Sequence, residues 1–579
     1  MSAALSATNA RIAQAPGAAR APLPNSAFHP GPDARPAPAF AGVLHCSPTR
    51  LVMQPPLEEP LIEGRDASIF PGIALELFTL EGLLVPVQRG EMVRESVAGA
   101  APSYWRMITQ PGRIWRESDD AAWSWAAFPL TLVNDTENHA HQGLARFCYR
   151  DGQISPLTVQ FVQQSAPYRL RQHFIAWGEV AVRLAPADRA ALEEHRARAL
   201  DELASRLPAK PWSALPASTS LALEGFGGPV LPRWRVATAL FRDGTLYVQD
   251  SQTPFGAYPY PLEMRFGVRS VMKSIGAPLA LLHLAQQYGP WVLSLNIGDY
   301  VSGLHPKWRR IRFLDAANMT SGFGGTGSVH SNPNDVLDGY LEADYDGWYT
   351  APSHDAKLAR INASLRPYPW EPGTVMRYRD QDFYLLGAAL DGFLKSQRAG
   401  SADLWEMLSS EVFGPIGIQH APAVRTREAG GRDGLIWLSA GYYPTLDELA
   451  KIARLYLNRG EHAGRQILHR QLTQELLAAR DAIRKDADRS LAREGVDAAR
   501  SPAEYYKMGF HFRPYHAPAS GHLHHLPMMS GAGGSEVILY PDRSASIVIA
   551  KALHVPDGEP WQSDDPLQTI RAMNRLAPF

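Results

Sequence analysis

A serine and a lysine three residues apart form the pattern in this chain with the clearest chemical meaning, Ser270-Val-Met-Lys273. Residues at i and i+3 lie on one face of a helix, so the lysine amine can reach the serine hydroxyl. Serine becomes a nucleophile when an adjacent base takes its proton. Burial and neighbouring cations lower the pKa of a lysine, which lets it act as that base. The pattern therefore indicates nucleophilic catalysis by Ser270 with Lys273 as its activating partner.

Two features of the surrounding sequence support this interpretation. Lys273 is the only one of the nine lysines that has a serine three residues before it. The apolar run from Ile275 to Leu284 predicts a buried helix, whereas the alternative is a lysine that extends into water from an exposed one. A serine at the helix start would also gain the favourable helix dipole for an oxyanion. Pro278 is expected to kink or interrupt this helix.

A second candidate segment is Tyr378-Arg-Asp380, which precedes the apolar helical stretch 383–387. A phenol beside cations can take part in proton transfer, so Tyr378 is predicted to act with Lys273. The alternative is a tyrosine that only packs at the entry of a helix.

The third candidate segment runs from Met529 to Gly534 and directly precedes a predicted strand over 536–540. Small residues there would let a substrate lie along the strand edge. The backbone N–H groups of Ala532 and Ser270 are predicted to form an oxyanion hole. Four residues are expected to contact the substrate: Asp380, Met529, Ser530 and Gly531. The alternative is an ordinary glycine-rich turn.

Together the three segments resemble class C β-lactamases, D-Ala-D-Ala peptidases and related esterases, which carry Ser-x-x-Lys, Tyr-x-Asn and Lys-Thr-Gly or His-Thr-Gly in this order. Asn318–Gly322, Ser439–Tyr442 and Leu446–Leu455 also look like segments of that superfamily, so the likeness covers roughly 230–553. The resemblance implies an α+β fold, a β-lactamase-like α/β/α sandwich around an antiparallel sheet. It also implies an acyl-enzyme formed on Ser270.

Two positions depart from the superfamily pattern. Asp380 stands where Asn is usual, and Met529 stands where lactamases and peptidases carry Lys and many esterases carry His. Methionine cannot attract the carboxylate of a penicillin or of a peptide C-terminus. Esters or small amides are therefore the predicted substrates. A peptidase or β-lactamase that uses Arg377 or Arg379 for the carboxylate, and a catalytically silent binding or scaffold module, remain as alternatives.

The domain organisation follows from changes in composition along the chain. Residues 1–40 are rich in Ala, Pro, Asn and Ser and are predicted to be a disordered tail. Alternating strand patterns, including 73–80, 128–133 and 157–162, predict an all-β, sandwich-like domain over 41–206. It ends in a helix within 184–206 that Asp188 caps.

A proline-rich linker is predicted over 207–220, followed by the hydrolase domain over 221–579. Strand patterns at 234–241, 245–249, 535–540 and 545–550 predict that the two ends of this domain share one sheet. The N-terminal domain is expected to fold separately from it. Oligomerisation, substrate gating and partner binding all remain open as its role. Aromatic residues in one insertion are expected to wall the substrate cleft: Tyr340, Tyr345, Trp348, Tyr349, Tyr368 and Trp370.

Composition narrows the remaining functional classes. The 579 residues carry a net charge of −1, which gives no reason to expect a nucleic-acid or membrane partner. Cys46 and Cys148 are interpreted as unpaired thiols, although one bridge between them stays open. His139 and His141 are expected at a surface or in a loop. We expect a cytoplasmic enzyme without a metal or cofactor, because no secretory signal or metal-ligand spacing is seen.

Overall fold

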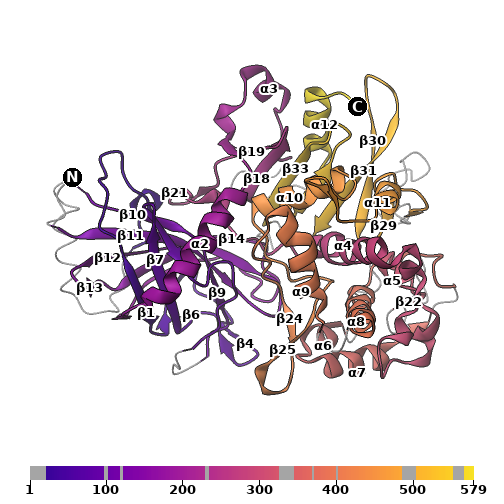
Figure 1. The fold of residues 1–579 in the computed structure, drawn as a ribbon, viewed down its shortest axis with the longest axis horizontal. Helices are drawn as coiled ribbons and strands as arrows, with labels where there is room; N and C mark the ends of the chain where they lie inside the picture. The colour runs from indigo at the N-terminus through magenta and orange to yellow at the C-terminus, as the bar shows by residue number, and fades with distance from the viewer. Residues whose placement is uncertain are drawn as a thin grey trace.

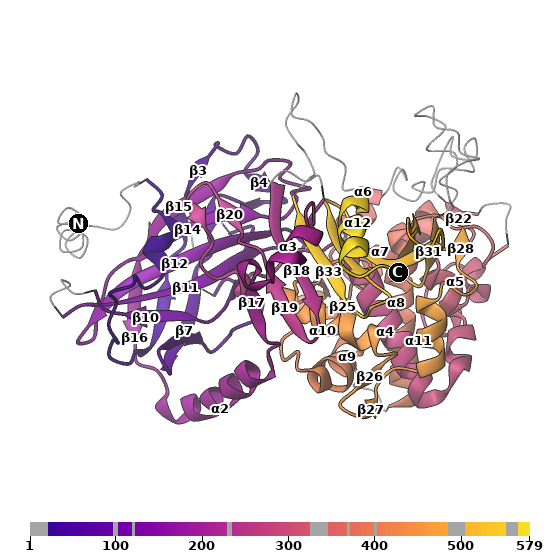
Figure 2. The ribbon, with the colours of Figure 1, turned by 90° about the horizontal axis from the view of Figure 1, so that it is seen from above.

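The structure is a computed structural model that describes residues 21–96, 102–117, 122–228, 234–324, 345–367, 371–398, 402–484, 504–551 and 566–579. A large N-terminal sheet lies beside a mixed α/β domain, and the helix that leads from one to the other packs against the N-terminal sheet with its C-terminal end at the junction (Figure 1). Seen from above, the N-terminal sheet and the α/β domain are next to each other along the long axis (Figure 2).

The N-terminal domain is built on one twelve-stranded sheet, in the order β16-β1-β7-β8-β10-β11-β12-β14-β15-β3, with β13 beside β12 and β9 beside β11. The ring centroids of Phe40, next to β1, and Phe147, on β12, lie 5.2 Å apart although these strands are not neighbours. The sheet therefore curls around a single core, which confirms the predicted all-β domain. Its strands are β1 (Ala41–Cys46), β3 (Val52–Gln54), β7 (Ile73–Leu80), β8 (Leu83–Pro86), β9 (Arg106–Thr109), β10 (Gly112–Trp115), β11 (Ser124–Val133), β12 (Ala140–Arg150), β13 (Gln153–Ile154), β14 (Leu157–Gln164), β15 (Ile175–Val180) and β16 (Val182–Ala185).

The disordered tail predicted over 1–40 is wrong for its second half. Phe28 is fully buried, and the Leu23 N–H donates to Gln160 Oε1 at 2.9 Å. The Asn25 side chain reaches across to Thr253 Oγ1 at 2.8 Å. Residues 21–40 are thus held by contacts with both domains, which polar composition alone does not reveal. Residues 1–20 lie outside the described part of the chain.

The hydrophobic core does not stop at the domain boundary. Every residue of β11 is buried, and so is nearly every residue of β12, so both faces of these strands are covered. Phe147 belongs to the interior of the curled sheet. Its neighbour Cys148 belongs to a core shared with Tyr258 and Phe266 of the α/β domain. Adjacent strand residues point to opposite faces, so the sheet is packed between two cores.

The predicted linker becomes part of the second sheet. The helix α2 (Arg189–Ser205) begins where expected, since the Asp188 side chain accepts from the Ala190 N–H. Residues 209–211 then form β17, which pairs in parallel with β19. The short helix α3 (Ala217–Ala222) follows. The segment 207–220 is therefore structured and joined to its neighbours, so the domains meet through a continuous core rather than through a free linker.

The second domain has a nine-stranded sheet in the order β17-β19-β18-β33-β32-β31-β30-β29-β28. β18 pairs with β33, so the two ends of the domain share the sheet as predicted. Helices lie on both faces, with α4 and α10 on one and α3 and α12 on the other, which is the predicted α/β/α sandwich. The strands are β17 (Ala209–Pro211), β18 (Arg235–Arg242), β19 (Thr245–Val248), β28 (Ile483–Arg484), β29 (Tyr505–Lys507), β30 (Phe510–His516), β31 (Leu523–Gly531), β32 (Ser535–Leu539) and β33 (Ala545–Ala550). The helices are α4 (Val271–Tyr288), α5 (Phe313–Ala317), α6 (Tyr345–Thr350), α7 (His354–Ser364), α8 (Asp380–Gln397), α9 (Leu404–Leu408), α10 (Leu446–Leu457), α11 (Arg470–Leu477) and α12 (Leu567–Leu576).

Pro278 does not interrupt helix α4, contrary to the expectation from sequence. Proline lacks the N–H that would bond to the carbonyl four residues earlier, which is that of Ser274. The Tyr456 hydroxyl, from α10, donates to that carbonyl at 2.8 Å. The freed acceptor is thus satisfied from outside the helix, and α4 continues to Tyr288.

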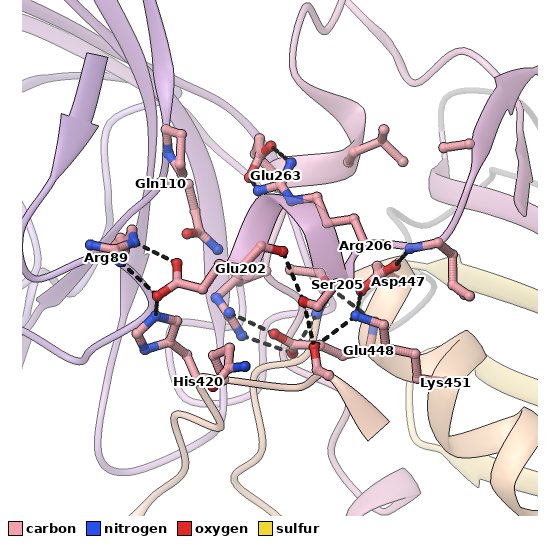
Figure 3. Close-up of a pocket in the computed structure, with 18 of the residues that line it drawn as sticks. Arg89, Gln110, Glu202, Ser205, Arg206, Glu263, His420, Asp447, Glu448 and Lys451 are labelled. Atoms are coloured by element: carbon pink, nitrogen blue, oxygen red, sulfur yellow. Dashed lines mark hydrogen bonds and ion pairs between the residues drawn. The ribbon is translucent and has the colours of Figure 1, made fainter. Parts of the chain in front are cut away.

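A cluster of ion pairs seals part of the domain junction around a cavity of about 70 Å³ (Figure 3). Arg89 binds both carboxylate oxygens of Glu202, at 2.5 and 2.6 Å, and His420 lies 3.0 Å from the same group. Arg265 binds both oxygens of Glu448 at 2.7 and 3.0 Å. The set also includes two further pairs: Arg206 with Glu263, and Lys451 with Asp447. Each charge has an opposite partner, so we interpret the cluster as a structural junction.

Cys46 and Cys148 form no disulfide, as predicted, and both are buried. Among the described residues, no helix is both long and apolar enough to cross a membrane.

Candidate active site

Ser270 stands at the N-terminal end of helix α4, directly before its first residue, Val271. This is the position that the sequence predicts for a nucleophile. The side chain is about nine-tenths buried, so most of its surroundings are protein. No acceptor for the Ser270 N–H is found among the described residues, and this N–H stands at the positive end of the helix dipole.

Lys273 connects the serine to three other groups. Its Nζ donates to Ser270 Oγ at 2.8 Å and to the Ser439 carbonyl at 2.7 Å. It also pairs with Asp380 Oδ1 at 2.6 Å. An ammonium group has three protons to donate, and these three acceptors share them with the Tyr378 hydroxyl. The Lys273 side chain is 1% exposed, so the network is shielded from water.

The charge state of Lys273 differs from the sequence prediction. Burial by itself would lower the pKa of this lysine, but Asp380 and Tyr378 outweigh it and the pKa is raised above its ordinary value. The resting side chain is therefore an ammonium and cannot itself take the serine proton. The sequence alone does not show this carboxylate at 2.6 Å, and the role of Lys273 as the activating partner of Ser270 stays a prediction.

Tyr378 lies two residues before helix α8 and packs beside Lys273. Lys273 Nζ is 5.0 Å from the centre of the Tyr378 ring, and the two side chains are hydrogen-bonding partners. The ring of His511 is 6.3 Å away from that of Tyr378. The first two predicted motifs thus converge on a single buried lysine.

Asp380 is committed to protein groups rather than facing the substrate. One carboxylate oxygen pairs with Lys273, and the other accepts from the Tyr345 hydroxyl at 2.7 Å. The residue is 3% exposed, which corrects the expected substrate contact. Tyr345 stacks on Tyr349, so part of the aromatic insertion does reach the site. Three of its predicted members lie outside the described residues: Tyr340, Tyr368 and Trp370.

The third motif lies against the turn that carries the nucleophile. A Cβ atom on Gly531 would lie only 2.2 Å from the Val268 carbonyl oxygen, so a glycine is needed for this close approach. Ala532, the next residue, is exposed, and no acceptor for its N–H is found in the described parts of the chain. This arrangement is consistent with the predicted oxyanion hole, which stays a prediction.

Met529 was expected to contact the substrate, but in the structure it is fully buried. Successive residues of β31 face opposite sides of the sheet. Met528 accordingly packs in the core of α3 and α12, and Met529 packs in the core that contains α4. Ser530 is half-buried. The segment therefore presents no side-chain cation beside Ser270.

Arg377 and Arg379 were the alternative source of positive charge for a substrate carboxylate. Arg377 is 2% and Arg379 is 1% exposed. Arg379 Nε lies 3.2 Å from Asp382 Oδ1. Both guanidinium groups are thus enclosed by protein rather than lying along an open wall of the site.

Three features of the site were missed or misread at the sequence level. The Ser439 carbonyl is a backbone group, and no side-chain pattern could mark it. Asn138, from the N-terminal domain, contacts the nucleophile turn, and its only signal was a cluster of turn-forming residues starting at Asn134. His139 and His141 were expected at a surface or in a loop; His139 does lie in the loop before β12 and His141 on β12, but both are fully buried.

The beta-lactamase family model matches residues 235–569, which is more than half of the chain. The chain therefore belongs to the beta-lactamase family, and the fold agrees with the resemblance seen in the sequence. No curated protein matches the chain.

Three solved structures illustrate the similarity. A penicillin-binding protein homologue from Caulobacter crescentus is 15% identical, with 62% of this chain and 96% of that chain covered and a TM-score of 0.39. A family VIII carboxylesterase is 14% identical, with 62% and 96% covered and a TM-score of 0.39. A D-stereospecific amidohydrolase from Streptomyces sp. is 16% identical, with 62% and 97% covered and a TM-score of 0.37.

Proposed function

We propose that this protein is a serine hydrolase that cleaves ester or small-amide bonds through an acyl-enzyme on Ser270. The observation that carries the proposal is the hydrogen bond of 2.8 Å from a buried ammonium to the Ser270 hydroxyl oxygen. A buried charge is costly unless its partners compensate it. A buried lysine that donates a hydrogen bond to a serine hydroxyl and lies beside a tyrosine is suited to support nucleophilic catalysis.

In the proposed reaction, Ser270 Oγ attacks the carbonyl carbon while its proton passes to the Tyr378 hydroxyl oxygen, which gives up its own proton to the leaving oxygen or nitrogen. Lys273 remains an ammonium and stabilises the negative charge that develops on the oxygen atoms around it. The N–H groups of Ser270 and Ala532 would bind the carbonyl oxygen as it becomes an oxyanion. The alcohol or amine departs with that proton. Water then attacks the acyl-enzyme by the reverse relay, in which a proton of the water passes through Tyr378 to Ser270 Oγ as the acid is released.

The choice of esters and small amides over β-lactams rests on the third motif, Met529–Gly534, which carries no cationic side chain. A penicillin presents a carboxylate near its scissile bond, and burying an unpaired carboxylate costs several kcal/mol. Met529 offers only a thioether and is fully buried. Arg377 and Arg379 are also enclosed by protein. Substrates without a carboxylate avoid this cost.

The proposal is tested by comparing kcat/KM for p-nitrophenyl butyrate, its anilide analogue and nitrocefin. We expect the ester to be hydrolysed fastest. Ser270→Ala should lower turnover by at least about 10³-fold with the fold retained. Faster hydrolysis of nitrocefin would overturn the substrate class. A Ser270→Ala variant that keeps most of its activity would overturn the proposed nucleophile.

A further inference from the structure

The residue before the nucleophile has an unfavourable backbone conformation. Arg269 has a φ of +48°, in the left-handed region that residues with a Cβ atom rarely adopt. Such a conformation persists only where surrounding contacts hold it, and it is often found at functional sites. The Arg269–Ser270 peptide is planar, so the Arg269 backbone sets the direction of the Ser270 N–H.

The contacts that hold Arg269 come from the N-terminal domain. The Asn138 Oδ1 atom accepts from the Arg269 N–H at 2.6 Å. The Arg269 guanidinium donates to the Ala166 carbonyl and lies 5.7 Å from the centre of the Tyr168 ring. Both the backbone and the side chain of Arg269 are thus anchored outside the domain that carries Ser270.

Asn138 also holds the segment that positions the lysine. Its Nδ2 atom donates to the Tyr442 carbonyl at 3.0 Å. The same carbonyl accepts from the Val268 N–H at 3.5 Å, and the carbonyl of Ser439 on this segment accepts from Lys273. One side-chain amide therefore connects the backbone before Ser270 with the backbone that orients Lys273.

The fit between the two domains at this point leaves no room for adjustment. A Cβ atom on Gly267 would lie 1.8 Å from the Asn138 carbonyl oxygen. Asn138 is 1% exposed and has a φ of +53°, which asparagine tolerates better than most residues. The position thus favours an asparagine for both its backbone and its amide.

The loop that carries Asn138 is itself fixed. Asn134 Oδ1 accepts from the Glu137 N–H at 2.8 Å. The buried Glu137 carboxylate accepts from the Tyr104 hydroxyl at 2.9 Å and from the Tyr168 N–H at 2.8 Å. These contacts hold Asn138 and the Ala166–Tyr168 segment in one rigid unit against the nucleophile turn.

We propose that Asn138 is a positioning residue for Ser270, so that the N-terminal domain completes the active site of the α/β domain. The inference rests on the proposed serine hydrolase function. Asn138 touches neither substrate nor reacting atoms, and it acts by holding Arg269 in the conformation that aims Ser270. A misplacement of about 1 Å can cost about 10²-fold in rate.

The test uses the full chain with Asn138→Gly, which removes the amide but accepts the positive φ without strain. We expect kcat for p-nitrophenyl butyrate to fall by about tenfold or more, with KM within about twofold, because orientation and not binding is lost. The rate of Ser270 labelling by a fluorophosphonate should fall by the same factor. Asn138→Asp keeps the acceptor for the Arg269 N–H and should retain more activity than the glycine variant.

The matched control is Gln142→Ala. Gln142 is equally buried and also bridges the domains, through the backbone of Arg265, but it does not reach Arg269. We expect a similar loss of thermal stability and an unchanged kcat.

Equal kcat losses in Asn138→Gly and Gln142→Ala, or wild-type labelling in Asn138→Gly, would overturn the inference and leave the proposed function intact. If the glycine variant does not fold, Asn138→Asp takes its place. The inference about Asn138 would then be overturned by wild-type kinetics in Asn138→Asp together with a reduced kcat in Gln142→Ala. A wild-type protein that takes no label on Ser270 would instead overturn the proposed function, and the inference with it.

Discussion

Two buried groups of charges in this molecule differ in how their partners are shared. At the domain junction, each arginine or lysine has its own carboxylate, as in the pair Arg89–Glu202 (Figure 3) and in the pair Arg265–Glu448. Arg265 and Lys451 also donate to backbone carbonyls. At the candidate active site, Lys273 is divided among a serine, a backbone carbonyl and a carboxylate. Complete pairing makes a stable junction, whereas a cation shared with a hydroxyl can change partners during a reaction. Buried charge alone therefore does not distinguish the candidate active site. The serine hydroxyl among the acceptors of Lys273 does.

Breaking an ion pair at the domain junction should lower stability without affecting catalysis. Glu448→Gln leaves the Arg265 guanidinium, which is 2% exposed, without its carboxylate. Removing one partner of a buried ion pair costs about 3 to 5 kcal/mol. We expect the free energy of unfolding to fall by that amount, measured by urea denaturation, while kcat stays within about twofold. A large kcat loss in folded protein would mean that the two groups are not separate in function.

Removing a member of the Lys273 group should affect catalysis more than stability. Lys273→Ala removes the cation beside Ser270 and should lower kcat by about 10²-fold or more, the scale expected for a positioned catalytic group. That factor corresponds to about 2.7 kcal/mol of transition-state stabilisation. Tyr378→Phe should give a similar loss while leaving the melting temperature almost unchanged. Wild-type kinetics in Tyr378→Phe would assign the tyrosine to packing.

Helix α10 serves both groups, because it carries Glu448 and also Tyr456, which bonds to the nucleophile helix. Tyr456→Phe leaves the Ser274 carbonyl without the partner that replaces the N–H of Pro278. We expect a loss of about 1 to 2 kcal/mol in stability, as for a buried acceptor left unsatisfied. Thermal unfolding of Tyr456→Phe and of the double variant Tyr456→Phe with Pro278→Ala measures this. The double variant should recover part of the loss, since alanine restores the N–H within the helix.

The smallest effect is expected from removing the negative charge of Asp380, one of the partners of Lys273. Asp380→Asn places the usual residue of the superfamily in the site, so kcat at neutral pH should change by less than about tenfold. Asp380 raises the pKa of Lys273, whereas burial lowers it. Without the carboxylate, Lys273 loses its proton at a lower pH, and the ammonium that supports catalysis is lost sooner. The basic limb of the kcat/KM profile should therefore move to lower pH, and an unmoved limb would show that Lys273 does not titrate there.

Sequence patterns predicted the structural features that depend on residues close together in the chain. The Asp188 cap and the strand 73–80 follow from residue types that act on their own neighbours, and the structure contains both. The serine–lysine spacing likewise places both side chains on one helix face.

What the sequence could not predict depends on groups that meet only after folding. The charge of Lys273 is set by Asp380, more than a hundred residues later, and the continuity of α4 past Pro278 depends on Tyr456. The nucleophile turn depends on Asn138 from the other domain. A domain boundary drawn from composition also hid the shared core, because a strand buried on both faces looks like any other apolar strand.

The nucleophile assignment is tested most directly by treating the full-length protein with a fluorophosphonate and locating the adduct by peptide mass spectrometry. We expect one adduct, on the peptide that contains Ser270, in native protein. No label is expected in denatured protein or in Ser270→Ala, and labelling of Lys273→Ala should be at least about 10²-fold slower. An adduct on another serine, or native protein that takes no label while it hydrolyses esters, would contradict the assignment of Ser270.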